Sequence, residues 1–156
     1  MSTTAKSNAK STTRRKPAQS AQERPAAQAV QFPFECPKPR QTHPAEAVAV
    51  VREVSKDAVK IFLMPRPSAV RCILNETFGP LGWGERRYFA DGRLWCAVGV
   101  FNPYMGDYCF RDAAAFEGKH PGSPERWKEE TSFVAAAELW GVGSDVLALP
   151  PIVLRG

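Results

Sequence analysis

The feature of the sequence that most restricts the fold is the alternation of apolar and polar residues between positions 83 and 116. Three runs, WGERRYFA, RLWCAVGVF and DYCFRDAAAF, are separated only by DG and NPYMG. Alternation with a period of two and such short connections is typical of antiparallel strands joined by tight turns. We therefore predict a three-stranded antiparallel meander in this part of the chain.

The two faces of the central run differ in character. One face carries Leu94, Cys96, Val98 and Val100. The other carries Trp95, Ala97, Gly99 and Phe101. The first set predicts a continuous apolar core surface covered by helices, and the second predicts a shallow strip of small residues flanked by aromatic rings.

Two helices are predicted around this meander. The first begins at Pro67 or Ser68 and ends before Gly79 and Pro80, which supply a left-handed cap and a stop. Its apolar face consists of Val70, Ile73, Leu74 and Phe78. The second begins after the N-cap Ser123 and runs to Trp140. Its packing face consists of Phe133, Ala136, Ala137 and Trp140.

The remaining segments are shorter. Residues 45 to 54 suit either a short helix or a strand, and residues 58 to 64 (AVKIFLM) predict a strand. The segment GVGSDVLALPPIVL is expected to leave through a glycine turn into a short apolar tail. These elements predict an α+β fold, with residues 32 to 156 forming one domain.

The net charge of +5 belongs to the N-terminal segment. Residues 1 to 31 hold six basic residues against one acid, whereas the rest of the chain has equal numbers of both. The segment has almost no large apolar residues, so we predict a disordered tail. It would act either as an arm that binds polyanions or as a solubilising leader.

Few residues suggest catalysis. The glycines lack the lysine and the spacing of a phosphate-binding loop, and no nucleophile has a histidine base in a recognisable arrangement. Cys36, Cys72, Cys96 and Cys109 form no close pair, so neither a metal nor a cofactor is expected. We expect reduced, mostly buried thiols in an intracellular protein that does not associate with membranes.

One enzymatic pattern remains open. Asp112, Glu117 and Lys119, with Asp107 as an alternative first member, resemble the acids and lysine with which many nucleases hold magnesium and activate water. The simpler interpretation is that these are solvated charges at the end of a strand.

A nucleic-acid interface is the other candidate. The predicted hairpin mixes cations with aromatic residues, as single-strand binding surfaces do: Arg86, Arg87, Tyr88, Arg93 and Trp95. The alternative is an ordinary exposed hairpin whose arginines shield the sheet.

A short string then suggests a family. VRCILNETFGPLGW, residues 70 to 83, resembles the helix and turn of the Rad fifty-two family of single-strand annealing proteins. The matching positions are Asn75, Glu76, Phe78, Gly79, Gly82 and Trp83. Asp112 fits the acidic strand end of the family's meander, and TSFVAAAELWGVG resembles its last helix and exit. The resemblance spans roughly residues 45 to 149.

The resemblance also has departures. Many members carry a Lys-Arg pair in the last helix that lines the strand-binding groove, where this chain has Val134 and Ala135. The arginine often found before the first helix's apolar run falls at Ala69, flanked by Arg66 and Arg71. The groove residues that the resemblance leaves as candidates are Lys60, Arg66, Arg71, Arg86, Arg87, Lys119 and Lys128.

The resemblance implies a function without a reaction centre. It implies single-stranded DNA binding and ATP-independent annealing in recombination and repair by a homo-oligomeric ring. It further implies a bacteriophage or mobile-element protein in the cytoplasm of a bacterial host, with a host or phage single-strand-binding protein as a further candidate partner. The nuclease and an oligomeric module that binds single strands without annealing them are the alternatives.

Overall fold

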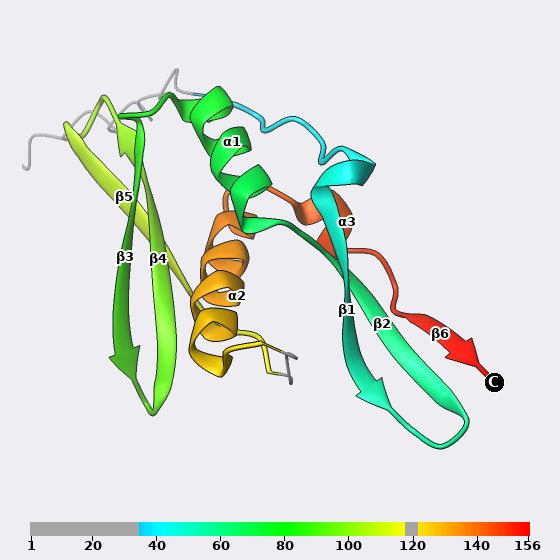
Figure 1. Cartoon of the computed structure of the whole chain (residues 1–156). Coiled ribbons are helices and arrows are strands. Elements are labelled where there is room, and N and C mark those ends of the chain that lie inside the picture. The colour runs from blue at the N-terminus through cyan, green and yellow to red at the C-terminus, as the bar shows by residue number, and fades with distance from the viewer. Residues whose placement is uncertain (1–34, 118–121) are drawn as a thin grey trace, which may run out of the picture. The chain divides into compact units, whose positions relative to one another are not determined.

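The domain is an α+β structure with two antiparallel sheets of three strands each (Figure 1). A computed structural model describes residues 35–117 and 122–156, and Glu35–Gly156 form one compact unit. The predicted tail at residues 1 to 31 lies outside the described residues, as do residues 32 to 34 of the predicted domain.

The predicted meander is confirmed. Strands β3 (Trp83–Ala90), β4 (Arg93–Asn102) and β5 (Asp107–Ala114) pair in that order. Asp91 and Gly92 connect the first two strands with positive φ angles of 52° and 71°, as a type I′ turn requires. All four residues of the predicted core face of β4 are buried.

Both predicted helices are also confirmed, and they pack on one face of the meander (Figure 1). Helix α1 (Pro67–Phe78) ends as predicted, whereas α2 (Pro124–Glu138) ends two residues before Trp140, in a turn that leads to Gly141. Ser123 caps α2 by accepting a hydrogen bond from the Arg126 amide. Residues 131 to 137 of α2 are buried without interruption, because the helix is packed on more sides than the one predicted.

The second sheet was only partly foreseen. Strand β1 (Ala47–Val54) shows that the strand alternative was right, and it pairs with β2 (Ala58–Pro65). The exit segment, predicted as a turn and an apolar tail, instead forms helix α3 (Ser144–Leu147) and strand β6 (Ile152–Arg155). Strand β6 completes the sheet by pairing with β2. Its four residues carry no turn or helix signal, and only the edge of β2 makes them a strand.

The string that suggested a family has a structural explanation. The Gly79 amide donates to the Asn75 carbonyl at 2.9 Å, and the Asn75 side chain accepts from the Trp83 indole at 2.7 Å. A Cβ at Gly82 would collide with the backbone of Phe78, so only glycine fits this turn. These residues join the end of α1 to the start of β3, and so they specify the fold and no chemistry.

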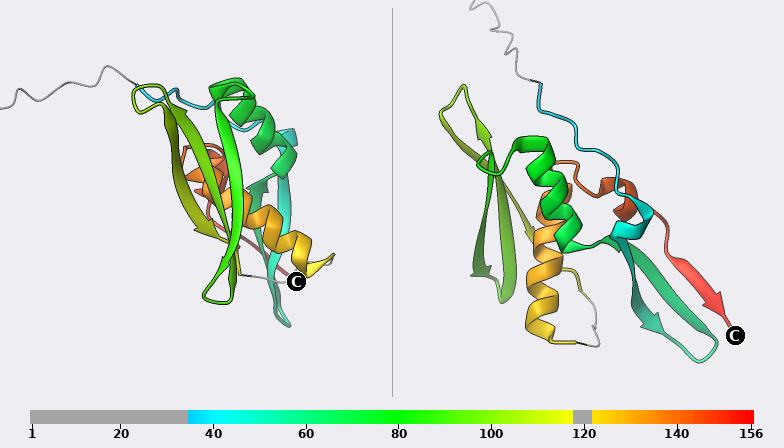
Figure 2. Two further views of the ribbon diagram at one scale, coloured as in Figure 1. Left: turned by 90° about the vertical axis from the view of Figure 1, so that its left-hand side faces the viewer. Right: turned by 45° about the horizontal axis from the view of Figure 1, so that its top comes forward.

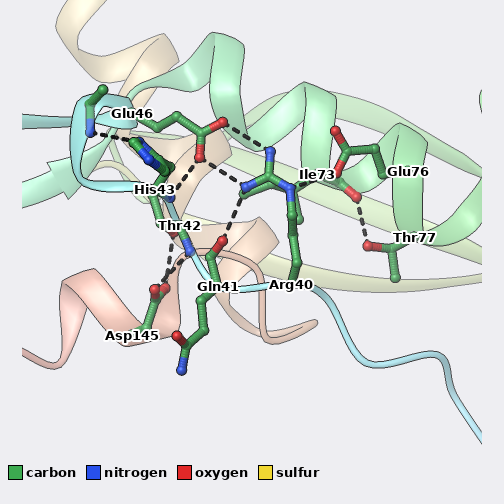
Figure 3. A network of polar contacts seen from close by, with 10 residues as sticks. Arg40, Gln41, Thr42, His43, Glu46, Ile73, Glu76, Thr77 and Asp145 are labelled. Carbon is green, nitrogen blue, oxygen red and sulfur yellow. Dashed lines mark hydrogen bonds and ion pairs between the residues drawn. The ribbon is translucent and has the colours of Figure 1, made fainter.

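A polar network fastens the segment before β1 to the rest of the domain (Figure 3). Arg40 donates two hydrogen bonds of 2.9 Å to Glu46 and one of 2.6 Å to Glu76 on α1. Thr42 donates through its amide and its hydroxyl to Asp145 on α3, at 2.8 and 3.0 Å. The network therefore ties residues 40 to 46 to two helices that are distant in the sequence.

We predict that this network weakens in acid. Hydrogen bonds from the Arg40 side chain and the His43 amide lower the pKa of Glu46 from 4.5 to about 2. Because folding lowers the pKa, the carboxylate stabilises the domain fully above about pH 4.5 and loses that contribution as the pH falls through 2. The melting temperature of wild type should therefore exceed that of Glu46→Gln at pH 6, and the gap should close towards pH 2.

The control for this measurement is Glu53→Gln. Glu53 forms an ion pair with Lys60 in which the two side chains are 58% and 49% exposed, so its gap from wild type should be smaller. A gap between wild type and Glu46→Gln that stays constant from pH 6 to pH 2 would contradict the prediction.

Two further expectations are settled in part. Cys96 is the one buried cysteine among the described residues, so the prediction of mostly buried thiols is wrong: Cys36 and Cys72 are exposed and Cys109 is intermediate. Burial raises the pKa of the Cys96 thiol to about 11, which keeps it protonated. No helix in the described part of the chain is long and apolar enough to cross a membrane.

Candidate nucleic-acid interface

The second face of the meander is the candidate site. The strand register places Tyr88 opposite Trp95 and Gly99 opposite Phe110, and it places Ala97 of the central strand between Arg86 on β3 and Asp112 on β5. Helices α1 and α2 pack on the other face, and no described helix or strand covers this one (Figure 1; Figure 2, left). We call the side chains of these positions, with Phe101 and Tyr108, the outer face.

Phe110 and Arg86 form the centre of the outer face. The Phe110 ring lies against Gly99, since a Cβ on Gly99 would come within 2.5 Å of the ring. The Arg86 guanidinium lies over the same ring, 3.9 Å from its centroid. Arg86 has no ion pair among the described residues, so its N–H groups are available to an anion.

A second pair of rings lies beside this centre. Tyr88 and Trp95 stack with their planes 9° apart and their centroids 6.4 Å apart. The Tyr88 hydroxyl donates to Asp112 at 2.6 Å, and this hydrogen bond raises the pKa of the tyrosine above its ordinary value. Asp112 thereby holds the Tyr88 side chain across the central strand.

The aromatic surface continues towards the other end of the strands. The rings of Phe101 and Tyr108 meet edge to face with their centroids 5.4 Å apart, and the centroids of the Tyr108 and Phe110 rings are 6.2 Å apart. Tyr88 and Phe101 are each 39% exposed. The outer face is therefore a strip of five aromatic rings with one unpaired cation, set on small residues of the central strand.

The structure divides the predicted hairpin residues. Arg86, Tyr88 and Trp95 lie together on the outer face, and Arg93 begins the same strand as Trp95 but is paired with Glu117 at 2.7 Å. Arg87 points to the opposite face, where it contacts Glu85 at 3.4 Å and Glu129 at 4.0 Å. Grouping Arg86 with Arg87 in one surface was wrong, because neighbouring residues of a strand point to opposite faces.

The remaining candidates are scattered. Arg71 belongs to α1, where it forms an ion pair of 3.1 Å with Glu85 and its guanidinium stacks over the Phe133 ring. Lys60 lies in the second sheet, paired with Glu53. Arg66 lines a pocket of about 390 Å³ near the start of α1, and Lys128 lines another of about 460 Å³ beside Trp127. Lys119 lies outside the described residues.

The positions of the family's basic pair are inaccessible in this chain. Val134 is fully buried and Ala135 is 8% exposed. In the described domain, these two positions of α2 therefore cannot line a strand-binding groove.

The acids of the nuclease pattern do not gather into one cluster, and Lys119 lies outside the described residues. Asp112 accepts the Tyr88 hydroxyl, Glu117 pairs with Arg93, and Asp107 lies at the opposite end of β5 from Glu117. Within residues 35–117 and 122–156, no three acidic, histidine or cysteine side chains come together as a metal site.

Sequence reasoning missed Phe110, Tyr108 and Asp112 as members of the interface. The signal was present: these residues alternate along β5, so they share one face of that strand, and the register brings this face beside Trp95. Comparison of the chain with family models, with curated proteins and with solved structures finds no match.

Proposed function

We propose that the protein binds single-stranded DNA on the outer face and, as a homo-oligomer, anneals complementary strands without ATP. The observation that carries the proposal is the strip of aromatic rings that no described helix or strand covers, together with Arg86, which has no ion pair among the described residues. Sheets that present aromatic side chains in this way bind unstacked bases, and arginine adds phosphate contacts.

The arrangement suits annealing as well as binding. A base that stacks on Tyr88 and Trp95 uses its ring face, so its Watson–Crick edge stays free for a second strand. Base pairing supplies the free energy, and the protein only has to hold the strand extended. The proposal therefore needs no reaction centre.

The charge distribution is consistent with different roles for the N-terminal segment and the domain in DNA binding. Residues 32 to 156 carry no net charge, whereas residues 1 to 31 carry six cations and one acid. We propose that stacking of the bases on the outer face holds the single-stranded DNA in place, while the basic segment adds salt-dependent attraction for its phosphates.

Assembly of several copies is supported by the resemblance and by the second sheet. The far end of that sheet exposes Val54, Val153 and Leu154 at 71%, 45% and 53%, and β6 leaves one strand edge unpaired. An exposed apolar edge strand is a surface that other protein chains cover. Mass measurement in solution tests whether those chains are further copies of this one.

Neighbouring arginines provide the first test. Arg86→Ala should weaken binding of a single-stranded oligonucleotide by about tenfold, or about 1.4 kcal/mol. The variant removes the cation that contacts phosphates and the guanidinium that stacks on the Phe110 ring. Arg87→Ala is the matched control: it lies on the same strand but faces the helices, and it should change the affinity less than twofold. Fluorescence anisotropy measures both, with circular dichroism to check folding.

If Arg87→Ala lost more affinity than Arg86→Ala, the single-stranded DNA would bind on the side of the sheet that faces the helices. That result would contradict binding on the outer face. Annealing itself is tested with labelled complementary oligonucleotides, without ATP and with a chelator. Faster pairing supports the proposal. Binding without faster pairing indicates a non-annealing module, and cleavage that appears only when magnesium is restored indicates the nuclease.

A further inference from the structure

We infer that Asp112 makes the outer face selective for cytosine and adenine over thymine and guanine. The inference rests on the proposed function, because it concerns how the same face reads the bases that stack on it. Cytosine and adenine share an exocyclic amino group where thymine and guanine have a carbonyl oxygen.

Asp112 is the one carboxylate on the outer face of β3, β4 and β5. The other acids of these strands, Glu85 and Asp107, occupy positions of the opposite face. The Oδ2 atom of Asp112 accepts the Tyr88 hydroxyl at 2.6 Å, and no described residue donates to its Oδ1 atom. Asp112 is exposed, so Tyr88 holds a carboxylate that keeps one oxygen unused by any described residue.

The carboxylate lies at the edge of the stacking platform. The ring on which a base would stack is the ring whose hydroxyl touches Asp112, so the edge of that base comes close to the free oxygen. Phosphates are repelled by Asp112 and attracted by Arg86, which stands on β3 while Asp112 stands on β5. The DNA backbone therefore runs on the β3 side, with the base edges turned towards β5.

A carboxylate only accepts hydrogen bonds, and this decides which bases fit. The amino group of cytosine or adenine has two hydrogens, of which one takes part in Watson–Crick pairing and the other lies on the major-groove edge. Asp112 can accept the second hydrogen and leave the pairing edge free for annealing. Thymine and guanine present a carbonyl oxygen there, which the carboxylate repels.

The test compares oligo(dC) with oligo(dT) of equal length, since both are pyrimidines with similar rings. Wild type should bind oligo(dC) about fivefold more tightly than oligo(dT), the lower end of the range for base discrimination, because Asp112 is exposed to water. Asp112→Asn should bring the two affinities within twofold, because the amide can also donate to the thymine oxygen. The readout is the ratio of affinities, so a general gain from removing a negative charge does not affect it.

Two further variants make the test specific. Asp107→Asn removes an acid from the other face of the same strand and should leave the ratio unchanged. Tyr88→Phe keeps the aromatic ring but removes the hydroxyl that donates to Asp112, so it should reduce the ratio of the two affinities. Equal affinity of wild type for both oligonucleotides, or a ratio that survives in Asp112→Asn, would overturn the inference. Absence of binding to either strand would instead overturn the proposed function.

Discussion

Replacing Val134 with lysine, which introduces one residue of the basic pair that the Rad fifty-two family carries at the position matched by the resemblance, is expected to unfold the domain. Val134 is fully buried in α2 among the core residues. The buried polar residues in the described part of the chain are Thr42, Thr131 and Ser132, none of which carries a charge to pair with an ammonium group, and an unpaired buried charge costs about 3 to 5 kcal/mol. This is a large part of the stability of a domain of this size, so urea denaturation should show an early transition or none.

Leu139→Lys is the control for this variant. Leu139 directly follows the same helix but is 43% exposed, so a lysine there can reach water and should cost less than about 1 kcal/mol. If Val134→Lys were stable and bound single-stranded DNA more tightly, then this face of α2 would be open in the working protein. The candidate interface would in that case lie on the helix and not on the outer face.

Replacing Gly99 with alanine should disrupt the outer face by displacing the Phe110 ring that packs on Gly99. The new Cβ would approach the Phe110 ring to 2.5 Å, so the ring must move and Arg86 loses the surface it covers. Overpacking of this kind costs about 1 to 3 kcal/mol. We expect about a tenfold loss of affinity for single strands, because the central ring and the cation are displaced together.

Gly84→Ala is the matched control for this prediction. Gly84 stands directly opposite Gly99 in the register, and a Cβ there would meet no atom within 4 Å. Stability and binding should therefore stay close to wild type. If Gly84→Ala and Gly99→Ala lost stability and affinity equally, then glycine would be needed at these positions for strand geometry. The contact between Gly99 and the Phe110 ring would not be the cause.

The helices and the meander were predictable because local signals agree with the tertiary structure. The cap at Ser123, the stop at Gly79 and the Asp91–Gly92 turn each act within a few residues, and the structure places element ends beside all three. The alternation of β4 identified its core face for the same reason. Where a signal is local and tertiary packing does not oppose it, the sequence suffices.

The candidate site was predictable only in part. Arg86, Tyr88 and Trp95 were identified from composition, and the two-residue period of a strand should have separated Arg86 from Arg87. Phe110 and Asp112 join them through the pairing of β4 with β5, a register that no short motif announces. The partners of Arg71 and Arg87 depend on how α1, α2 and β3 pack together, so their ion pairs could not be foreseen.

The sequence by itself determined the order and type of most elements, because capping, turn chemistry and apolar periodicity are short-range properties of the chain. The tertiary structure alone decided that Phe110 and Asp112 lie beside the hairpin residues, that β6 exists, and that Val134 is buried on a helix predicted to pack with one face. Burial and strand pairing depend on residues far apart in the chain, so they arise only when the elements come together.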